Sequence, residues 1–406
     1  MTSVEGSAST DRLKVLMVAP TSFFKDYGGH IRIYEEANTL QKQGHSITIA
    51  TYNLGDDLPG LTIRRTKPLP YHADYEVGSS RHKLSFDLLL LIKTLQVAWE
   101  IKPDIVHGHM HEGSLIGGVA ARLLKIPLIF DFQGSLTSEM VDHGFLKSNG
   151  LVFSFFHRLE KIACRRPAAI LTSSEQAVSL LEGEFGVDSA KIHPLPDCVD
   201  TERFNREKFS DADRDMIRAK YGIPENCPVV IYLGLLADYQ GTPEIIKTAA
   251  VLKEQGREVF FLIMGFPKAD IYQKMANDLG LQGNMKFTGK VEYRNAARNL
   301  AVGDIAISAK VSSTEGSGKV LNYMAMSIPV VAFDTVVHRE YLGELGVYAP
   351  VGDVRALASG IERLIADPVE AKRLGTELNQ RVKDSYSWEQ AGKKISELYQ
   401  RLTTSS

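Results

Sequence analysis

The segment from Ser312 to Met326 contains the residues best suited to hold a phosphorylated ligand. A Glu-Gly-Ser-Gly-Lys loop leads into a helical sequence, and an apolar run follows at 328–331. Such a loop presents N–H groups and the positive end of the helix dipole to phosphate oxygens. Lys319 adds an ammonium charge, which would stabilise a diphosphate leaving group as a glycosidic bond breaks. The segment therefore predicts a diphosphate site. We expect Glu315 to hold sugar hydroxyls and Asn322, on the same helix face as Lys319, to reach a ribose.

A second glycine-containing loop, Asp-Tyr-Gly-Gly-His at 26–30, follows the first apolar run and precedes a helix. Gly28 and Gly29 would let the backbone approach a phosphate or a sugar closely. A tight strand-to-helix turn explains the same residues equally well. The loop lacks the GxGxxG dinucleotide pattern, which argues against an oxidoreductase, and the chain contains no GxxxxGK[ST] phosphate loop.

The sequence His-Gly-His-Met-His-Glu at 107–112 suggests a metal site. Alternate residues of a strand share a face, so only His107, His109 and His111 could converge. We favour instead a buried, hydrogen-bonded His107 and a cleft-facing His109 that donates to a sugar hydroxyl, and we expect no metal.

A polar loop at 131–139 ends the next apolar run, and it offers the oxygen acceptors that sugar hydroxyls require. A helix cap led by Ser135 or Thr137 is an equally good explanation for these side chains. The predicted acceptor-binding residues are His30, Arg32, His111, Gln133 and Glu139.

Short runs rich in Val and Ile alternate with helical segments, which is typical of βαβ units around parallel sheets. In the N-terminal half the expected strands are 13–19, 46–51, 104–109, 126–132, 168–173 and 191–194, and the expected helices are 30–43, 83–101, 113–124, 151–164 and 174–185. In the C-terminal half the expected strands are 229–233, 259–264, 285–288, 305–309, 329–333 and 347–350. At 406 residues the chain is long enough for two cores. We expect a disordered lead at 1–11, a Rossmann-like acceptor domain at 12–203, a linker at 204–226, a Rossmann-like nucleotide-sugar domain at 227–383 and a closing helix at 384–406.

The composition is 44% hydrophobic and 24% charged with a net charge of -2, which argues against a general nucleic-acid binder. Three scattered cysteines and the lack of a secretory signal or a membrane-spanning run indicate a cytoplasmic protein. The mixture of apolar and basic residues at 145–166 fits an interfacial helix at the inner face of a membrane. We favour a core-facing helix with a basic exposed edge, which explains the same residues.

The segment at 312–326, together with the loop at 26–30, resembles the retaining GT-B glycosyltransferases of family 4, from Val15 to about Leu402. The Pro-Asp-Cys-Val-Asp segment at 196–200 and the Tyr-Ser-Trp-Glu segment at 386–389 are also similar to family sequences. The resemblance implies two Rossmann-like doubly wound α/β domains facing a central cleft, with the final helix packed on the N-terminal domain. His109, Glu315 and Lys319 become the catalytic residues. The predicted donor-binding residues are Gly28, Gly29, Gly234, Gln240, Gly265, Val291, Ser317, Gly318, Val320 and Asn322.

The chain departs from this family at three positions. Leu235 and Gln240 occupy places where the family often has an Arg and a Lys directed at the diphosphate, and Asn322 replaces a glutamate. Lys319 is then the main predicted cation on the diphosphate, with Arg32, Lys290 and Arg294 as helpers.

We therefore expect a retaining enzyme that moves a hexose from a nucleotide sugar such as a UDP- or GDP-sugar to a hydroxyl of a carbohydrate or lipid-linked acceptor, without a cofactor. A sugar-nucleotide epimerase and a non-catalytic nucleotide- or sugar-binding protein of the same fold are the alternatives.

Overall fold

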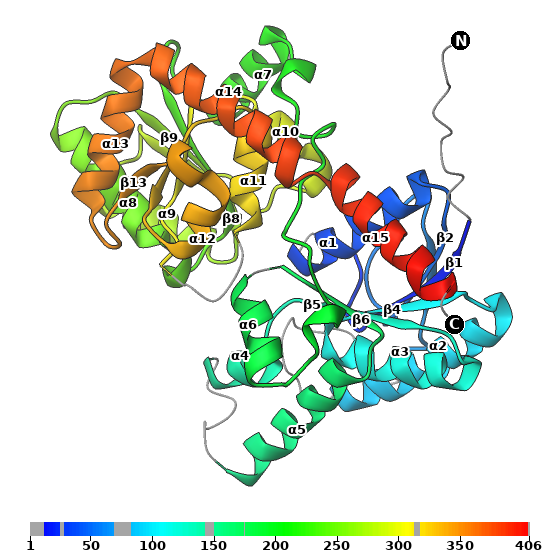
Figure 1. Cartoon of the computed structure of the whole chain (residues 1–406). Coiled ribbons are helices and arrows are strands. Elements are labelled where there is room, and N and C mark those ends of the chain that lie inside the picture. The colour runs from blue at the N-terminus through cyan, green and yellow to red at the C-terminus, as the bar shows by residue number, and fades with distance from the viewer. Residues whose placement is uncertain are drawn as a thin grey trace, which may run out of the picture. The chain divides into compact units, whose positions relative to one another are not determined.

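The computed structural model describes residues 12–24, 28–68, 83–142, 150–173, 175–311 and 317–404. These residues form two compact units (Figure 1). The first unit is built from two stretches of the chain, one up to Pro196 and one from Trp388 onward. The second unit runs from Asp197 to Ser387. Within the described ranges, no helix has both the length and the apolar composition needed to cross a bilayer.

A seven-stranded parallel sheet forms the centre of the first unit, in the order β3-β2-β1-β4-β5-β6-β7. Its strands are β1 (Lys14–Ala19), β2 (Ser46–Thr51), β3 (Thr62–Arg65), β4 (Ile105–His109), β5 (Leu128–Phe132), β6 (Ala169–Thr172) and β7 (Ile192–Pro194). All residues of β4 and β5 are buried, as expected for parallel strands covered on both faces. The strand order reverses between β1 and β4, and in doubly wound sheets such a reversal marks the crevice where ligands bind.

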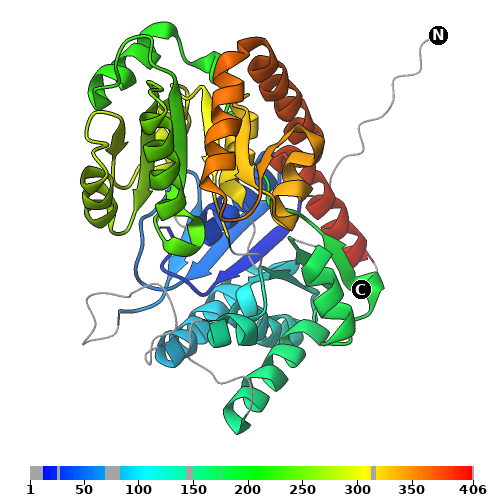
Figure 2. The same ribbon diagram turned by 90° about the vertical axis from the view of Figure 1, so that its left-hand side faces the viewer.

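Helices cover both faces of this sheet. They are α1 (Gly28–Lys42), α2 (Lys83–Ile101), α3 (Met110–Leu124), α4 (Leu136–Asp142), α5 (Leu151–Arg165), α6 (Glu175–Gly183), the 3₁₀ turn η1 (Ser189–Lys191) and α15 (Trp388–Thr404). Figures 1 and 2 show α1 and α15 on one face of the sheet and α2 and α3 on the other. The two helices α1 and α15 approach closely at Gly392, where an added Cβ atom would lie 2.4 Å from Cγ2 of Thr39.

The second unit contains a six-stranded parallel sheet in the order β10-β9-β8-β11-β12-β13. Its strands are β8 (Val229–Leu235), β9 (Phe260–Phe266), β10 (Met285–Phe287), β11 (Ile305–Ser308), β12 (Val330–Phe333) and β13 (Val347–Ala349). Its helices are α7 (Asp211–Tyr221), α8 (Thr242–Glu254), α9 (Ala269–Asp278), α10 (Tyr293–Leu300), α11 (Gly318–Ala325), α12 (Val336–Leu342), α13 (Val354–Ala366) and α14 (Pro368–Ser385), with 3₁₀ turns η2 (Arg206–Lys208), η3 (Asp238–Gln240) and η4 (Gly343–Leu345). Here the strand order reverses between β8 and β11.

Two parallel, doubly wound α/β units confirm the fold class that the alternating apolar runs predicted. Strand β3 was missed because it is a short edge strand whose residues alternate between exposed and half-buried and end in two arginines. The segment 204–226 is not a simple linker, since it contains α7 and belongs to the second unit. The sequence analysis read this segment as a linker because it is highly charged. Two features nevertheless indicate a helix: the capping box of Ser210 and Asp213 at its start and the left-handed Gly222 at its end.

Candidate active site

In the first unit, the predicted glycine loop and His109 lie at the two strand ends that flank the reversal of strand order. Helix α1 begins at Gly28, after β1, and His109 is the last residue of β4. The chain turns at once from β4 into α3, with Met110 in the left-handed region at a φ of 58°. Gly108 permits this turn, because an added Cβ atom there would lie 2.6 Å from the carbonyl oxygen of Gly113.

His109 is fully buried and is held by an ionised carboxylate. Its Nδ1 lies 3.2 Å from Oδ2 of Asp131, a carboxylate that also accepts from the Arg32 guanidinium at 3.0 Å and from the Gln133 amide at 2.8 Å. Burial alone would raise the pKa of Asp131, but the charge of Arg32 and the hydrogen bond from His109 hold that pKa well below its usual value. Nδ1–H donates to this carboxylate, which leaves Nε2 as the other nitrogen of the ring, and no described residue makes a hydrogen bond to that atom. His109 is buried in this structure, and its predicted contact with a sugar hydroxyl stays a prediction.

Gly29 lies beside this network. A Cβ atom added to Gly29 would stand 3.2 Å from Oε1 of Gln133. The structure therefore brings Gly29, Gln133, His109 and Arg32 together at one edge of the first unit.

Arg32 contributes to this network as a buried structural cation. Its side chain is 6% exposed and pairs with both Asp131 and Glu36, the latter at 3.2 Å. The Arg32 guanidinium pairs with carboxylates inside the unit, and its predicted contact with acceptor or diphosphate stays a prediction.

His107 is buried and hydrogen-bonded, as we expected. Its Nδ1 lies 2.7 Å from the hydroxyl of Tyr399 on α15, and its ring stacks on that of His109 with centroids 4.5 Å apart. Burial, followed by the charge of His109, keeps the pKa of His107 well below its ordinary value, so the ring is neutral. Helix α15 thereby contacts the residue that supports His109.

The ligand atoms of Glu36, His107 and His109 all lie within 4.8 Å of one another, a grouping that could hold a metal ion. The group differs from the three histidines that could have converged on one strand face, since it contains Glu36 and not His111. The Arg32 guanidinium already supplies the positive charge that Glu36 requires inside the unit.

Two other predicted acceptor residues have structural partners. His111 Nε2 lies 3.2 Å from Oε1 of Glu160, and its ring contacts Phe130 and Phe132. His30 is buried and hydrogen-bonds the hydroxyl of Thr21. The predicted acceptor contacts of His111 and His30 stay predictions. The side chain of Glu139 lies outside the described residues.

Glu160 was missed by the sequence analysis. It accepts hydrogen bonds from the backbone N–H groups of Leu136 and Thr137 and from the Thr137 hydroxyl, at 2.8, 3.2 and 2.5 Å. Burial acts to raise the pKa of Glu160, but the hydrogen bond and charge of His111 lower it overall. Glu160 is thus the residue that caps α4.

In the second unit, the predicted diphosphate loop leads into α11. Ser317 precedes the helix, and its buried hydroxyl has no hydrogen-bond partner among the described residues. Gly318 and Lys319 are the first residues of α11, where backbone N–H groups have no acceptor within the helix. Glu315 lies outside the described residues.

Lys319 is oriented by two neutral oxygens. Its Nζ donates to Oε1 of Gln240 at 2.5 Å and to the hydroxyl of Tyr232 at 3.3 Å, and it lies 4.8 Å from the centre of the Tyr232 ring. Burial raises the pKa of Tyr232 well above its ordinary value, so the phenol keeps its proton, which it donates to the carbonyl of Leu235 at 2.7 Å. Gln240, predicted to contact the donor, is therefore better described as a residue that positions Lys319.

Gly234 and Gly265 allow strands β8 and β9 to end close together beside this site. A Cβ atom on Gly234 would lie 3.2 Å from Cδ of Lys319, and one on Gly265 would lie 2.2 Å from the carbonyl oxygen of Gly234. The loop that carries Gln240 approaches β11 at Gly241, where a Cβ atom would lie 1.9 Å from the carbonyl oxygen of Ala309. These three glycines therefore maintain close backbone contacts around Lys319.

Lys310 is a second cation that the sequence analysis missed. It follows β11 and is 1% exposed. Burial, with the nearby charges of Lys319 and Lys310, lowers the pKa of His338 to about 4. The neutral His338 ring bonds the Ser308 hydroxyl at 2.9 Å and the Phe333 carbonyl at 2.7 Å. Two ammonium groups therefore act on one neutral imidazole close to α11.

The remaining predicted donor residues differ in their surroundings. Asn322 is half-buried one turn after Lys319 on α11, and Val291 is half-buried before α10. Val320 is fully buried and its N–H donates to the carbonyl of Ser317 at 2.8 Å, and its predicted donor contact stays a prediction. The proposed helper Arg294 is paired with Glu292 at 2.7 Å, and Lys290 lies over the ring of Phe266.

Two family models match the chain. The model described as Glycosyltransferase Family 4 matches residues 28–203, and the model described as Glycosyl transferases group 1 matches residues 213–398. Together the two matches span most of the chain.

The chain is also similar to individual proteins, among them two that are named as glycosyltransferases. A 2-deoxystreptamine glucosyltransferase of Streptomyces kanamyceticus is 24% identical over 77% of this chain and 81% of the relative. A phosphatidyl-myo-inositol mannosyltransferase of Mycobacterium leprae is 24% identical over 97% of this chain and 98% of the relative. The fold is similar to that of an Anabaena protein solved in complex with UDP and glucose, with a TM-score of 0.73 and 16% identity over 95% of this chain and 99% of that one.

Proposed function

We propose that this chain, which belongs to the GT-B glycosyltransferases of family 4, transfers a hexose from a nucleoside-diphosphate sugar to an acceptor hydroxyl with retention of anomeric configuration. The observation that carries the proposal is the group at the start of α11. There Ser317, whose buried hydroxyl has no partner among the described residues, is followed by the ammonium charge of Lys319, and the charge of Lys310 at the end of β11 acts with it on His338. Such a group suits a diphosphate, which needs donors and positive charge together.

Lys319 and the N-terminus of α11 would act mainly in the transition state. As the bond from the anomeric carbon to the diphosphate oxygen breaks, negative charge grows on the diphosphate, and fixed donors in a partly buried site stabilise that charge. Lys310 offers a reason why uncharged Leu235 and Gln240 are tolerated, because it supplies a second cation from the end of β11. The acceptor oxygen forms the new bond on the same face of the sugar, and its proton passes to the departing diphosphate.

His109 would bind a hydroxyl of the transferred sugar through Nε2. Its Nδ1–H is directed to Asp131, which fixes the ring and leaves Nε2 to accept a hydrogen bond. Gly29 and Gln133 lie at the same edge and are the first-unit candidates for sugar contacts. The relatives named above act, by their names, on 2-deoxystreptamine and phosphatidyl-myo-inositol. We accordingly propose a polyol acceptor, free or attached to a lipid.

The proposal is tested by incubating the purified chain with UDP-, GDP- and ADP-hexoses and measuring release of the nucleoside diphosphate. Each donor is tested alone, with 2-deoxystreptamine and with phosphatidylinositol vesicles. Acceptor-dependent release and a glycosylated product support the transferase. Conversion of the donor to an isomeric sugar nucleotide without acceptor indicates the epimerase, and thermal stabilisation by a nucleotide without any conversion indicates a binding protein.

A further inference from the structure

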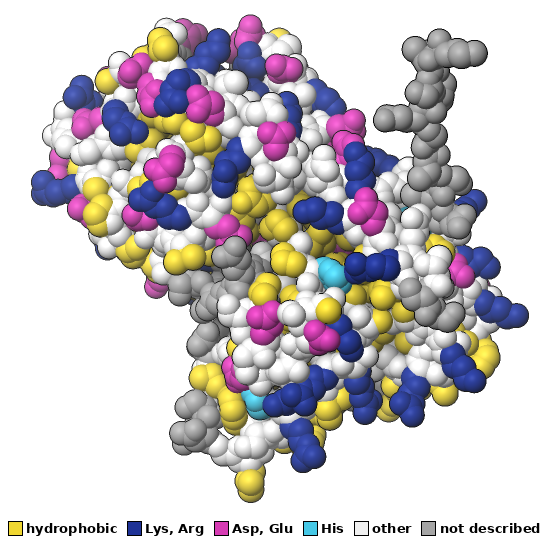
Figure 3. All heavy atoms as spheres, in the orientation of Figure 1, with side chains coloured by type: hydrophobic (Ala, Val, Ile, Leu, Met, Phe, Trp, Pro, Cys, Tyr) yellow, Lys and Arg dark blue, Asp and Glu magenta, His cyan; other side chains and the backbone are white. Residues whose placement is uncertain are grey.

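Helices α2 and α3 expose a set of apolar side chains on the face of the first unit that they cover. The set, here called the α2–α3 face, consists of Leu84, Leu88, Ile92 and Trp99 on α2 and Val119 and Leu123 on α3. Leu84 is 80% exposed and Trp99 is 61% exposed. Figure 3 shows hydrophobic side chains at the lower right, where Figure 1 places these two helices. Single exposed apolar residues are ordinary on a protein surface, but a contiguous set indicates an interaction site.

The exposed apolar residues of α2 form one stripe along the helix. With the half-buried Leu95, its members are Leu84, Leu88, Ile92, Leu95 and Trp99. At 3.6 residues per turn these side chains fall within about a quarter of the helix circumference, and they extend over roughly 22 Å of its axis. The other side of α2 buries Phe86 and Leu90 in the core of the unit. A helix that covers a sheet needs one apolar side, so the stripe is in excess of that requirement.

The exposed apolar area is close to what a stable dimer requires. A fully exposed aliphatic side chain offers about 60–120 Å² of apolar surface and an aromatic one about 150–250 Å², so the α2–α3 face offers on the order of 400 Å². A standard interface buries about 800 Å² per partner, and in homodimers about 65% of that area is apolar. The half-buried Leu91, Leu95 and Leu115 of the same two helices can supply the remainder.

The order of residues along α2 makes the helix complementary to a second copy of itself. Lys83 and Glu100 carry opposite charges at the two ends of α2. If two α2 helices run antiparallel, a two-fold axis midway between these residues sets Lys83 of one copy against Glu100 of the other. The same axis sets Leu84 against Trp99 and brings Ile92 beside its own copy, because both pairs have the same midpoint.

The charges at the ends of the stripe also favour this partner. Lys83 forms an ion pair with Glu112 inside its own unit. Glu100 pairs with Arg64 at 2.6 Å, and its side chain is 57% exposed. Each end of the stripe therefore presents both signs of charge, and the two-fold axis places unlike charges opposite each other. An interface between copies uses such a pattern to fix its register.

We propose that two copies of this chain associate through the α2–α3 face, with their α2 helices antiparallel across a two-fold axis near Ile92. Antiparallel helices also bring opposite ends of their dipoles together. Helices α2 and α3 cover a face of the sheet, whereas Gly29 and His109 lie at the ends of its strands, so the pairing does not use the residues of the candidate site. The inference goes beyond the proposed function, because its test measures association and not turnover.

Analytical ultracentrifugation of the full chain over a range of concentrations measures the association. We expect a species of twice the mass of one chain, in equilibrium with the monomer. Trp99→Ala should raise the dissociation constant about 30-fold or more, because a tryptophan in the centre of an interface is often a hot spot. Ile92→Lys should abolish the dimer, because it places two ammonium groups side by side at the axis. Val369→Ser, which removes an exposed valine of α14 in the second unit, is the matched control and should leave the dimer intact.

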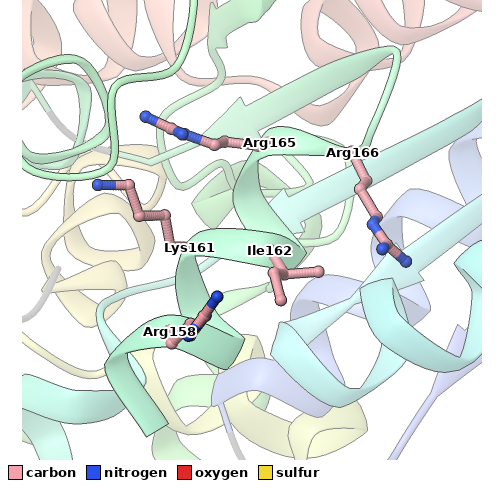
Figure 4. Close-up of a pocket in the computed structure, with 5 residues that line it drawn as sticks. All are labelled: Arg158, Lys161, Ile162, Arg165 and Arg166. Carbon is pink, nitrogen blue, oxygen red and sulfur yellow. The ribbon is translucent and has the colours of Figure 1, made fainter. Parts of the chain in front are cut away.

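Helix α5 provides a control for charge. It buries Glu160, Ala163 and Cys164, as expected of a core-facing helix with a basic edge. The cations of this edge line a shallow hollow of about 250 Å³, and Figure 4 shows Arg158 and Lys161 among them. Arg158→Gln with Lys161→Gln should leave the dissociation constant unchanged. Loss of the dimer in this variant would show that charges of α5 hold the copies together, and would overturn the proposal.

Disulfide trapping tests the orientation of the two helices. On treatment with oxidised glutathione, Ile92→Cys should form a covalent dimer, because the residue and its copy lie within the Cα separation of about 7 Å that a disulfide allows. Leu84→Cys should not, because this residue and its copy would be roughly 22 Å apart. The parent chain, oxidised in parallel, shows what its own three cysteines contribute.

Four results would overturn the proposal. They are a monomeric mass at every concentration, a dimer that Trp99→Ala does not weaken, equal trapping of Ile92→Cys and Leu84→Cys, and loss of the dimer in Val369→Ser. A monomer that sediments with phospholipid vesicles through Trp99 would show that a lipid surface covers the α2–α3 face, and this result would also overturn it.

Discussion

The Nδ1 atom of His109 lies 3.2 Å from Oδ2 of Asp131, and this contact determines which nitrogen of the imidazole can meet a sugar. The carboxylate remains ionised because Arg32 lies against it. Nδ1 must therefore carry a proton, which leaves Nε2 as the nitrogen that can meet a ligand. An interaction entirely inside the first unit thus prepares His109 before any substrate binds.

Asp131→Asn should lower both stability and turnover. Removing one member of a buried ion pair costs about 3–5 kcal/mol, and an amide no longer fixes the tautomer of His109. We expect turnover to fall on the order of 10²-fold or more. Urea unfolding followed by circular dichroism and initial-rate assays measure the two effects.

A triple variant separates stability from chemistry. Adding Arg32→Met and Glu36→Gln to Asp131→Asn removes the buried cation together with its second carboxylate partner and should restore much of the lost stability, but turnover should remain low. Recovery of turnover together with stability would show that the orientation of His109 is unimportant.

His111→Gln should affect stability and leave the reaction intact. The imidazole holds Glu160, which caps α4, and a glutamine alters the contact with a buried carboxylate. We expect a loss of about 1–3 kcal/mol of unfolding free energy with kcat/KM nearly unchanged for the folded fraction. A large increase in the KM for acceptor would instead restore His111 as an acceptor-binding residue.

Lys310→Met should weaken donor binding. A charged hydrogen bond contributes about 1.5–3 kcal/mol, so the KM for the sugar nucleotide should rise about tenfold or more. The exposed Lys286, changed to Met, serves as a control in the same unit. An unchanged KM in Lys310→Met would assign the diphosphate to Lys319 alone.

Acid should destabilise the second unit through His338. Burial, Lys319 and Lys310 lower the pKa of His338 from 6.5 to about 4, so the unfolded chain binds a proton in that interval and the folded unit does not. Stability is therefore full above pH 6.5 and declines as pH falls toward 4, by about 3 kcal/mol at most from this residue. His107 adds a decline of the same sign. Unfolding measured at about pH 7 and about pH 5, on either side of the ordinary histidine pKa, should show a smaller difference in His338→Gln than in the parent chain.

Apolar periodicity was sufficient to predict the fold. Each expected strand corresponds to a strand of the two sheets, because buried parallel strands require continuous apolar runs. Strand β3 and helix α4 were not predicted, since a half-exposed edge strand and a seven-residue helix bury too few apolar side chains to produce a pattern.

The candidate site was only partly predictable. Lys319 and Gly29 were recognisable from their loops, whereas the pairing of His111 depended on where β4 ends. A strand through residue 111 would have aligned three histidines, but α3 begins at Met110. Asp131 and Lys310 carried a usable signal, because each places a charge at the end of an apolar strand. The pairing of Arg32 with Glu36 has the i,i+4 spacing of a helix, but its pairing with Asp131 of β5 is a tertiary contact that no local pattern contains.

The central claim, that Lys319 stabilises the departing diphosphate, is tested most directly by the turnover of Lys319→Ala on the preferred sugar nucleotide. Lys286→Ala, which removes an exposed lysine of the same unit, is the matched control. We predict that kcat falls on the order of 10²–10³-fold in Lys319→Ala while its circular dichroism spectrum and the activity of the control remain those of the parent chain. Unchanged kcat in a folded Lys319→Ala would contradict the assignment.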